Sequence, residues 1–317
     1  SFIYYNLNRI PDASKIIPQE VYSRFKTSYQ YNLANNLKLW TEFLHIKGEF
    51  NTIGINPIPL KGIIFIHNLY SKFGLRKNID VDILIKETEL SICIDKLTQL
   101  GYQEKESISL AYRQKFHCHI SFFNPTKNII LELHWAPAPP RPDKIDLTEV
   151  WEKAKIQKID QQDVLTLSLE DTLLSLCINI CRNIPNLQFI PLKNLVDINE
   201  LISQYKDKLD WNYILNKITQ WRIKGCFFFL YSLTKNLLET PWPQDIVKQI
   251  YPPALQRKIL NCYSRELKLR SQISAILLML LMLDSFTDVI RLIFRLTSQA
   301  LSIFMQNKKL FSLYLKR

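Results

Sequence analysis

Two aspartates on one short apolar segment constrain this chain most. The segment 79–85 (IDVDILI) alternates in the manner of a strand, and a strand places residues i and i+2 on the same face. Asp80 and Asp82 therefore project together, while Val81 and Ile83 face the core. Two like charges side by side on a buried strand are costly unless a cation lies between them. A cluster of hard oxygen ligands suits Mg²⁺, which proteins often share with a substrate phosphate.

Helix and strand signals alternate around this segment. Gly101 ends a helical pattern, and the run 124–127 (NPTK) has the chemistry of a hairpin turn between two strand-like runs. The sequence predicts helices over 15–48, 62–72 and 87–100, and strands over 58–60, 79–85, 116–123 and 128–135.

After the proline-rich segment 137–142 the pattern is almost entirely helical. Ser168 resembles an N-cap, with Asp171 near the positive end of the helix dipole. We expect an α+β fold, in which helices flank a small mixed β-sheet core and a mostly α-helical C-terminal domain follows. The expected divisions are an N-terminal helical segment 1–48, a core 49–142 and a helical domain 143–317. Further helices are predicted near 192–205, 211–219, 223–238, 244–250, 255–266 and 270–305.

Composition sets broad limits. In 317 residues, a hydrophobic content of 47% supports a large core, and only six glycines argue against an all-β fold. A net charge of +12 favours an anionic partner such as a nucleotide, RNA or a membrane surface, or reflects a lysine-rich composition alone. The six cysteines lack C-x-x-C spacing, and no basic-then-apolar leader opens the chain, which favours a reducing, cytoplasmic compartment. The longest apolar run, 276–283, is too short to span a bilayer, so we expect no integral membrane span.

A turn upstream and a strand downstream add to the two aspartates. Gly62 opens the predicted helix and allows close approach of a phosphate, and Lys61 adds a point charge for a triphosphate. Glu132 lies on the strand 128–135 and shares a face with His134, so it completes a metal site or takes a proton from an attacking hydroxyl. Three roles stay open for His134: it orients the metal-binding side chains, it contacts the substrate, or it is a packed surface residue. Arg76 is a candidate phosphate clamp.

A second group of candidate ligands lies on the strand 116–123. His117 and His119 straddle Cys118 and therefore share one strand face, which is a candidate for the site side of the sheet. A zinc site would need two more ligands at suitable spacing, and none is evident nearby in the sequence. We therefore do not predict zinc.

Together these motifs resemble the DNA polymerase β-type nucleotidyltransferase superfamily. More narrowly, they are similar to a poorly characterised bacterial nucleotidyltransferase family. The resemblance covers roughly residues 20–300 and is densest over 58–135. Its motifs are Leu60-Lys61-Gly62, Tyr70, Arg76, Asp80-Val81-Asp82, Gly101-Tyr102, Glu132-Leu133-His134-Trp135 and Leu195-Val196-Asp197-Ile198.

The resemblance implies a reaction and a set of site residues. A nucleoside monophosphate passes from an NTP, expected to be ATP, to a hydroxyl or other acceptor, with Mg²⁺ and release of pyrophosphate. It implies a catalytic and metal-binding set of Asp80, Asp82 and Glu132, and a nucleotide-binding set of Lys61, Gly62, Arg76 and His134. Two positions depart from the pattern. Lys61-Gly62 stands where the superfamily has Gly-Ser or Gly-Gly, and Asn179 stands where the family has a histidine.

Several alternatives stay open at this stage. The acceptor is a small molecule, a peptide, a protein or tRNA, the last as in tRNA-modifying toxin-type transferases. A rival interpretation is a non-catalytic nucleotide-binding partner of a biosynthetic cluster. The basic C-terminal segment, which includes Arg291 and Lys308, packs as a helix, lies on a membrane surface or binds RNA. Exposed apolar faces could instead form a homodimer.

Overall fold

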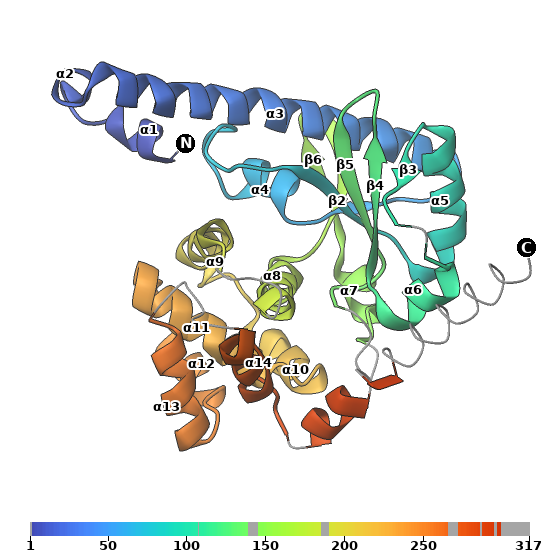
Figure 1. Cartoon of the computed structure of the whole chain (residues 1–317), viewed down its shortest axis with the longest axis vertical. Coiled ribbons are helices and arrows are strands. Elements are labelled where there is room, and N and C mark those ends of the chain that lie inside the picture. The colour runs from blue at the N-terminus through green and yellow to red at the C-terminus, as the bar shows by residue number, and fades with distance from the viewer. Residues whose placement is uncertain are drawn as a thin grey trace, which may run out of the picture.

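Five strands form one mixed sheet that organises the fold (Figure 1). The computed structural model describes residues 2–106, 108–138, 145–184, 190–265, 272–285, 287–294 and 297–298. The strands β2 and β5 run parallel, and the other neighbouring pairs are antiparallel. The expected α+β fold with a small mixed sheet is confirmed. Along the sheet the order is β1 (Ile58–Pro59), β2 (Asp80–Leu84), β5 (Ile129–His134), β4 (His119–Asn124) and β3 (Gln103–Glu104).

One long helix, α3 (Gln19–Asn51), packs against the sheet together with α5 (Leu90–Gln99) (Figure 1). Its apolar residues recur at helical spacing, and Phe43 and Phe50 are fully buried. From β2, Val81 is fully buried in the same core. The aspartates of β2 alternate with these core residues and therefore lie on the other face of the sheet. The long helix predicted over 15–48 is confirmed, with α3 spanning Gln19–Asn51.

The connections between the strands follow the expected order. The helix α4 (Gly62–Asn68) begins where predicted but is shorter than the range 62–72. A 3₁₀ turn, η1 (Glu87–Glu89), leads into α5, and Gly101 follows that helix with φ +81°. A positive φ of this kind is the conformation in which glycine commonly ends a helix.

A helix α6 (Leu110–Phe116) occupies part of the segment predicted to be the strand 116–123, so that part of the prediction is wrong. The Ser109 hydroxyl caps this helix by accepting from the Tyr112 backbone N–H at 3.4 Å. Tyr112 and Phe116 are both buried, which holds the turn against the sheet. β4 consequently begins only at His119.

A hairpin interrupts the second half of the chain, which the sequence predicted to be almost entirely helical. β6 (Lys155–Ile159) pairs antiparallel with β7 (Gln162–Thr166). The two turn residues, Asp160 and Gln161, have φ of 46° and 64°, as a two-residue hairpin loop with matching twist requires. Val164 is fully buried, and β7 packs beside β1. The prediction failed here because most other side chains of both strands are polar and exposed, which hides the period of two.

The remaining described segments form a group of helices that lies below the sheet in Figure 1. The Ser168 cap is confirmed, since the Asp171 backbone N–H donates to its hydroxyl at 3.0 Å. α8 packs against α9, α10 and α11. The helices are α7 (Thr148–Lys153), α8 (Leu169–Asn183), α9 (Leu192–Tyr205), α10 (Trp211–Gln220), α11 (Lys224–Leu238), α12 (Gln244–Gln249), α13 (Ala254–Tyr263) and α14 (Gln272–Leu281).

The single helix predicted over 270–305 is interrupted after α14. The Asp284 carboxylate accepts from the backbone N–H groups of Lys224 and Gly225 at 2.9 and 2.8 Å, which caps the start of α11. Arg291 lies in a further described helical segment, 287–294. Residues 299–317, with Lys308, lie outside the described residues, so the interpretations of the basic C-terminal segment stay predictions.

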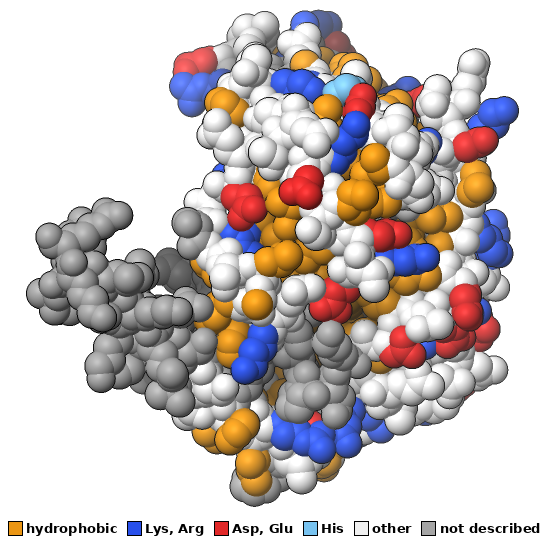
Figure 2. Space-filling view, turned by 90° about the vertical axis from the view of Figure 1, so that its right-hand side faces the viewer, with side chains coloured by type: hydrophobic (Ala, Val, Ile, Leu, Met, Phe, Trp, Pro, Cys, Tyr) orange, Lys and Arg blue, Asp and Glu red, His pale blue; other side chains and the backbone are white. Residues whose placement is uncertain are grey.

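Two short helices, α1 (Phe2–Leu7) and α2 (Ala13–Ile16), pack against α3. Among the described residues, no helix is both long and apolar enough to cross a membrane. Figure 2 shows one face of the molecule, where basic and acidic side chains are interspersed around a central apolar area. The charge of +12 therefore does not form one continuous basic surface on this face. The predicted division at residues 48 and 142 stays a prediction.

Candidate active site

The parallel pairing of β2 and β5 brings the predicted carboxylates together. Asp82 lies opposite Glu132 in the register, and Asp80 lies two residues earlier on the same strand face. Asp82 is 3% exposed, whereas Asp80 and Glu132 are half-buried. Three acidic side chains thus meet on the face of the sheet that α3 leaves uncovered.

A lysine lies between these carboxylates. Lys61 directly precedes α4, and its Nζ lies 2.8 Å from Asp82 Oδ1 and 3.9 Å from Glu132 Oε2. Burial alone would lower the pKa of Lys61, but the two carboxylates raise it above its usual range. The ammonium is therefore charged, and it is the cation that compensates the buried carboxylate in this state.

His134 completes the cluster from the end of β5. Its Nε2 lies 3.1 Å from Asp82 Oδ1 and 3.2 Å from Glu132 Oε2, and the ring is 2% exposed. Burial opposes its protonation, but hydrogen bonds to Asp82, Cys118 and Glu132 raise the pKa of His134 to about 9. The imidazolium and Lys61 together offset the acidic charge of the site.

The three carboxyl groups differ in their proton affinity. Burial, and then the charge of Asp82, raise the pKa of Asp80 to about 6. For Asp82, burial acts in the same direction, but Lys61 and His134 hold its pKa well below the usual range. Burial acts to raise the pKa of Glu132 as well, but its hydrogen bond to His134 and the charges of His134 and Lys61 together lower it. Asp82 and Glu132 are therefore anionic at neutral pH.

Gly62 lies in a turn that only glycine fits. Its φ is +25°, and a Cβ there would lie 3.1 Å from Asn78 Oδ1 and 3.5 Å from Arg76 Nη1. Arg76 in turn donates to the Asn78 side chain. The turn that contains Lys61 and Gly62 thus packs against the buried side chains of Arg76 and Asn78.

Arg76 forms a buried ion pair with Asp197 of α9. Its Nε donates to Asp197 Oδ1 at 2.8 Å and its Nη2 donates to Oδ2 at 2.7 Å, while the Tyr70 hydroxyl donates to the same carboxylate. Arg76 is 4% exposed and Asp197 is fully buried. Three of the motifs that carry the family resemblance therefore meet in one network, which links the helical half to the turn beneath Lys61.

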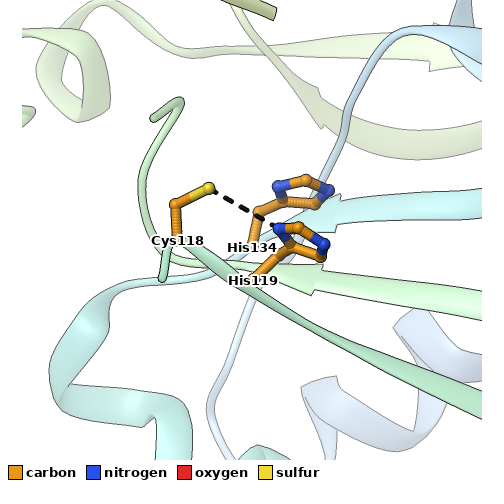
Figure 3. Close-up of side chains that lie close together, drawn as sticks. All are labelled: Cys118, His119 and His134. Atoms are coloured by element: carbon orange, nitrogen blue, oxygen red, sulfur yellow. Dashed lines mark hydrogen bonds between the residues drawn. The ribbon is translucent and has the colours of Figure 1, made fainter. Parts of the chain in front are cut away.

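His119 lies against the site, on the strand face that the sequence left open as the site side of the sheet, whereas Cys118 was not predicted there. His119 lies opposite His134 in the β4–β5 register, and the Trp135 backbone N–H donates to the Cys118 carbonyl at 3.0 Å. Figure 3 shows the three side chains grouped at this end of the two strands. Counting back from the predicted turn at 124–127 would have found the pair, because a tight hairpin fixes the register of both strands.

Two groups of side chains could hold a metal ion in the described part of the chain. One is Asp82, Glu132 and His134, and the other is Cys118, His119 and His134, with the ligand atoms of each group within 4.8 Å of one another. The first offers mostly hard oxygen, and the second offers sulfur and nitrogen.

A cavity next to the carboxylates separates the sheet from α8. Lys61 and His134 line it on the sheet side, and apolar residues such as Leu84 and Trp221 form much of the remaining wall. One face of α8 contributes polar side chains at helical spacing. These are Asp171, Ser175, Asn179 and Arg182.

Comparison with known proteins gives the family. A family model described as an uncharacterised nucleotidyltransferase matches residues 1–239. The chain belongs to this nucleotidyltransferase family. It is accordingly a transferase of the nucleotidyl-transferring class, as the motifs predicted. No curated protein matches the chain in sequence.

Solved structures show only distant similarity. The chain is similar to ANT(2″)-Ia in complex with adenylyl-2″-tobramycin, at 13% identity and a TM-score of 0.40, covering 58% of this chain and 96% of that one. It is similar to the lincosamide antibiotic adenylyltransferase LnuA with bound lincomycin, at 15% identity and a TM-score of 0.35, covering 51% and 94%. A nucleotidyltransferase-like protein from Paracoccidioides brasiliensis gives 14% identity and a TM-score of 0.36, covering 58% and 88%.

Proposed function

We propose that this nucleotidyltransferase uses Mg²⁺ to transfer a nucleoside monophosphate from an NTP, with ATP as the expected donor, to an acceptor hydroxyl. An oxygen of the acceptor bonds to the α-phosphorus, the bond to the bridging oxygen breaks, and pyrophosphate leaves. The observation that best supports this is the convergence of Asp82, Glu132 and His134 within 4.8 Å, with Asp80 on the same strand face.

The donor set of the site suits a hard dication. Asp80, Asp82 and Glu132 would hold Mg²⁺ through carboxylate oxygens, the ligands that this ion prefers. When bound, Mg²⁺ supplies positive charge that neutralises the triphosphate and the leaving pyrophosphate. Lys61 occupies part of this site in the ligand-free chain, since its Nζ lies 2.8 Å from Asp82.

Lys61, Gly62 and Arg76 are proposed to position the triphosphate. Once another cation neutralises Asp82, the ammonium of Lys61 is free to bind phosphate oxygens. The absence of a Cβ at Gly62 lets this turn pack against Asn78 and Arg76, which would hold Lys61 in place for that contact. Arg76 acts differently from a direct phosphate clamp: its guanidinium is engaged by Asp197 and Asn78, so it supports the turn from below.

The proton of the acceptor hydroxyl needs a destination. Glu132 has a lowered pKa, which favours its role as a metal ligand over that of a strong base. We therefore keep Asp80, Asp82 and Glu132 together as the proposed metal ligands, and the hydroxyl proton would pass to a carboxylate of this set once a bound metal has lowered the pKa of the hydroxyl.

The cavity beside α8 is proposed to hold the acceptor. Lys61 and His134 line it, and both contact Asp82, so a hydroxyl bound beside them would lie near the carboxylates. Its wall is largely apolar, with polar groups confined to the face of α8. An acceptor with an apolar body and a few hydroxyl or amide groups fits this lining better than a polycation does.

Binding measurements test the metal assignment. Calorimetry with Mg²⁺ and a non-hydrolysable ATP analogue should give binding in the wild type and at least tenfold weaker binding in Asp80→Asn and Asp82→Asn. Asp95→Asn is the matched control, because Asp95 is exposed on α5. If both site variants bind as the wild type does, the metal assignment is wrong.

Turnover separates the proposed enzyme from a non-catalytic nucleotide-binding partner. Pyrophosphate release should occur with one or more members of a panel of hydroxyl-bearing small molecules and peptides. In Asp82→Asn it should fall by roughly 10²- to 10³-fold. Label transfer from an NTP to total tRNA, without transfer to the small acceptors, would replace the proposed acceptor class by RNA. Absence of turnover across the panel and tRNA, with Mg²⁺-nucleotide binding intact, would contradict transfer activity.

A further inference from the structure

A thiol and two imidazoles meet at the start of β4, behind the carboxylates. Cys118 Sγ lies 3.6 Å from His119 Nδ1, and the rings of His119 and His134 are stacked with centroids 5.0 Å apart. Figure 3 shows the sulfur directed toward the paired rings. The three ligand atoms lie within 4.8 Å of one another.

These separations suit a tetrahedral dication. Zinc binds sulfur at about 2.3 Å and nitrogen at about 2.0 Å, so tetrahedral angles place the two ligand atoms roughly 3.5 Å apart. The observed separation between Cys118 Sγ and His119 Nδ1 is 3.6 Å. The rings of His119 and His134 are stacked with an interplanar angle of 25°, so the His119 ring must turn before both rings direct a nitrogen at the same ion.

The surroundings of the group resemble the outer shell of a metal site. Cys118 is 1% exposed and His134 is 2% exposed, so water has little access to either. The Nε2 of His134 is shared by the carboxylates of Asp82 and Glu132. Metal-bound histidines commonly direct their second nitrogen at a carboxylate in this way, which fixes the ring and raises its basicity.

The guanidinium of Arg182 contacts the sulfur of Cys118. Arg182 Nη1 lies 2.7 Å from Cys118 Sγ and 3.3 Å from the Pro137 carbonyl oxygen. This guanidinium stabilises the thiolate, which is the form that binds metals.

We propose that Cys118, His119 and His134 bind one Zn²⁺ ion, separate from the Mg²⁺ of the transfer reaction. The ligands are the Cys118 thiolate, Nδ1 of His119 and Nδ1 of His134, because Nε2 of His134 contacts the carboxylates of Asp82 and Glu132. When the ion binds, the Nδ1 proton of the His134 imidazolium is released to solvent. A fourth ligand would come from water or another small donor, since the described residues of this cluster supply three. Bound there, the ion holds the His134 ring in the orientation that contacts Asp82 and Glu132.

The competing explanation is a hydrogen-bonded thiol and imidazole cluster without metal. A sulfur to nitrogen hydrogen bond has a similar length, so distance alone does not separate the two. A direct bond between metal and thiolate does separate them, because only that bond gives a charge-transfer absorption with Co²⁺.

The test uses the full chain, stripped of metal and titrated with Co²⁺ and then Zn²⁺. We expect one Co²⁺ per chain, with a thiolate charge-transfer band and the visible bands of a tetrahedral ion, both displaced by Zn²⁺. In Cys118→Ser the charge-transfer band should disappear, and Zn²⁺ affinity against a chromophoric chelator should fall at least 100-fold. Cys262→Ser is the matched control, since Cys262 is exposed and remote in sequence.

His119→Asn provides a second variant should Cys118→Ser fail to fold, because His119 is only half-buried. It should keep a thiolate band but lose tetrahedral intensity and Zn²⁺ affinity. The proposal is overturned if the wild type gives no charge-transfer band, or if the band survives in Cys118→Ser. Calorimetry with Mg²⁺ and the ATP analogue is read separately, so failure of the zinc site leaves the transfer proposal intact.

Discussion

Lys61 offsets the negative charge of a group of carboxylates that is suited to bind a metal ion. Its ammonium contacts Asp82 and lies near Glu132, and it is only 22% exposed. A buried carboxylate that loses its cation retains the desolvation penalty without compensation. The stability of the ligand-free chain should therefore depend on Lys61.

Replacing Lys61 by Met should lower the free energy of unfolding by about 2 kcal/mol, less than for an isolated buried pair because His134 still contacts Asp82. Chemical denaturation followed by circular dichroism measures this loss. Added Mg²⁺ should raise the melting temperature of Lys61→Met more than that of the wild type.

Lys77→Met is the control, because Lys77 is exposed and its replacement should change stability by less than about 0.5 kcal/mol. Equal stability of the two variants would show that Lys61 does not compensate the carboxylates.

At the residue scale, the sequence indicated which side chains belong to the site, but it did not show which side chains they contact. The strand period placed Asp80 and Asp82 on one face, and the motif order associated Glu132 with them. The partner of Arg76 could not be predicted, because Asp197 lies 121 residues away along the chain. Its guanidinium suits a phosphate and a carboxylate equally well, and only the packing of α9 decides between them.

At the scale of elements, two glycines mark opposite extremes of packing. A Cβ on Gly225 would lie 2.4 Å from the Met282 carbonyl oxygen, where α11 meets the end of α14. A Cβ on Gly48, within α3, would meet nothing within 4 Å.

Gly225→Ala should destabilise the chain by about 2 kcal/mol, because the end of α14 must move away from α11. Gly48→Ala should stabilise it by about 0.5–1 kcal/mol, because alanine lowers the entropy cost of forming a helix. Urea denaturation of the two variants checks the signs. A stabilised Gly225→Ala would contradict the close contact between these elements.

The ion pair between Arg76 and Asp197 joins α9 to the segment before β2. Asp197→Asn should cost about 3–5 kcal/mol, because Arg76 would remain buried without a counter-charge. Arg76→Met should cost a similar amount, and the double variant should cost less than the sum of the two. A double-mutant cycle in urea measures the coupling, and additive effects would mean that the pair is not a unit.

The elements themselves were predictable where a strong period or a cap defined them, as for α3 and for α8 after Ser168. The hairpin of β6 and β7 could not be predicted, because too few of its residues are buried beside β1 to give an alternating apolar pattern. α6 was missed for a related reason, since its seven residues are too few to establish a helical period.

At the scale of the whole molecule, one apolar cluster runs through both halves of the chain. It includes Phe43 of α3, Leu176 of α8 and Leu260 of α13. Five of the six cysteines are buried, and Cys262 is exposed. Burial also raises the pKa of Cys93 to about 12, so this thiol stays protonated at pH 8.

Iodoacetamide at pH 8 should therefore label Cys262 rapidly in the native chain and the other five cysteines only on unfolding. Mass spectrometry of chains treated at increasing urea should show the five appearing together, as expected for one cooperative transition. Rapid native labelling of Cys93 or Cys177 would contradict the burial of this core.

The strand pairing of the site also has a consequence for folding. Glu132 and His134 meet His119 through a local hairpin, whereas Asp82 joins them only when β2 pairs in parallel across a long crossover. Local contacts form faster than distant ones, since closing a long loop costs more entropy. A chain that has formed only the hairpin holds one of the three carboxylates, Glu132, because Asp80 and Asp82 lie on β2. During refolding, the capacity to bind Mg²⁺ should therefore appear in the last phase, and it reports completion of the native topology.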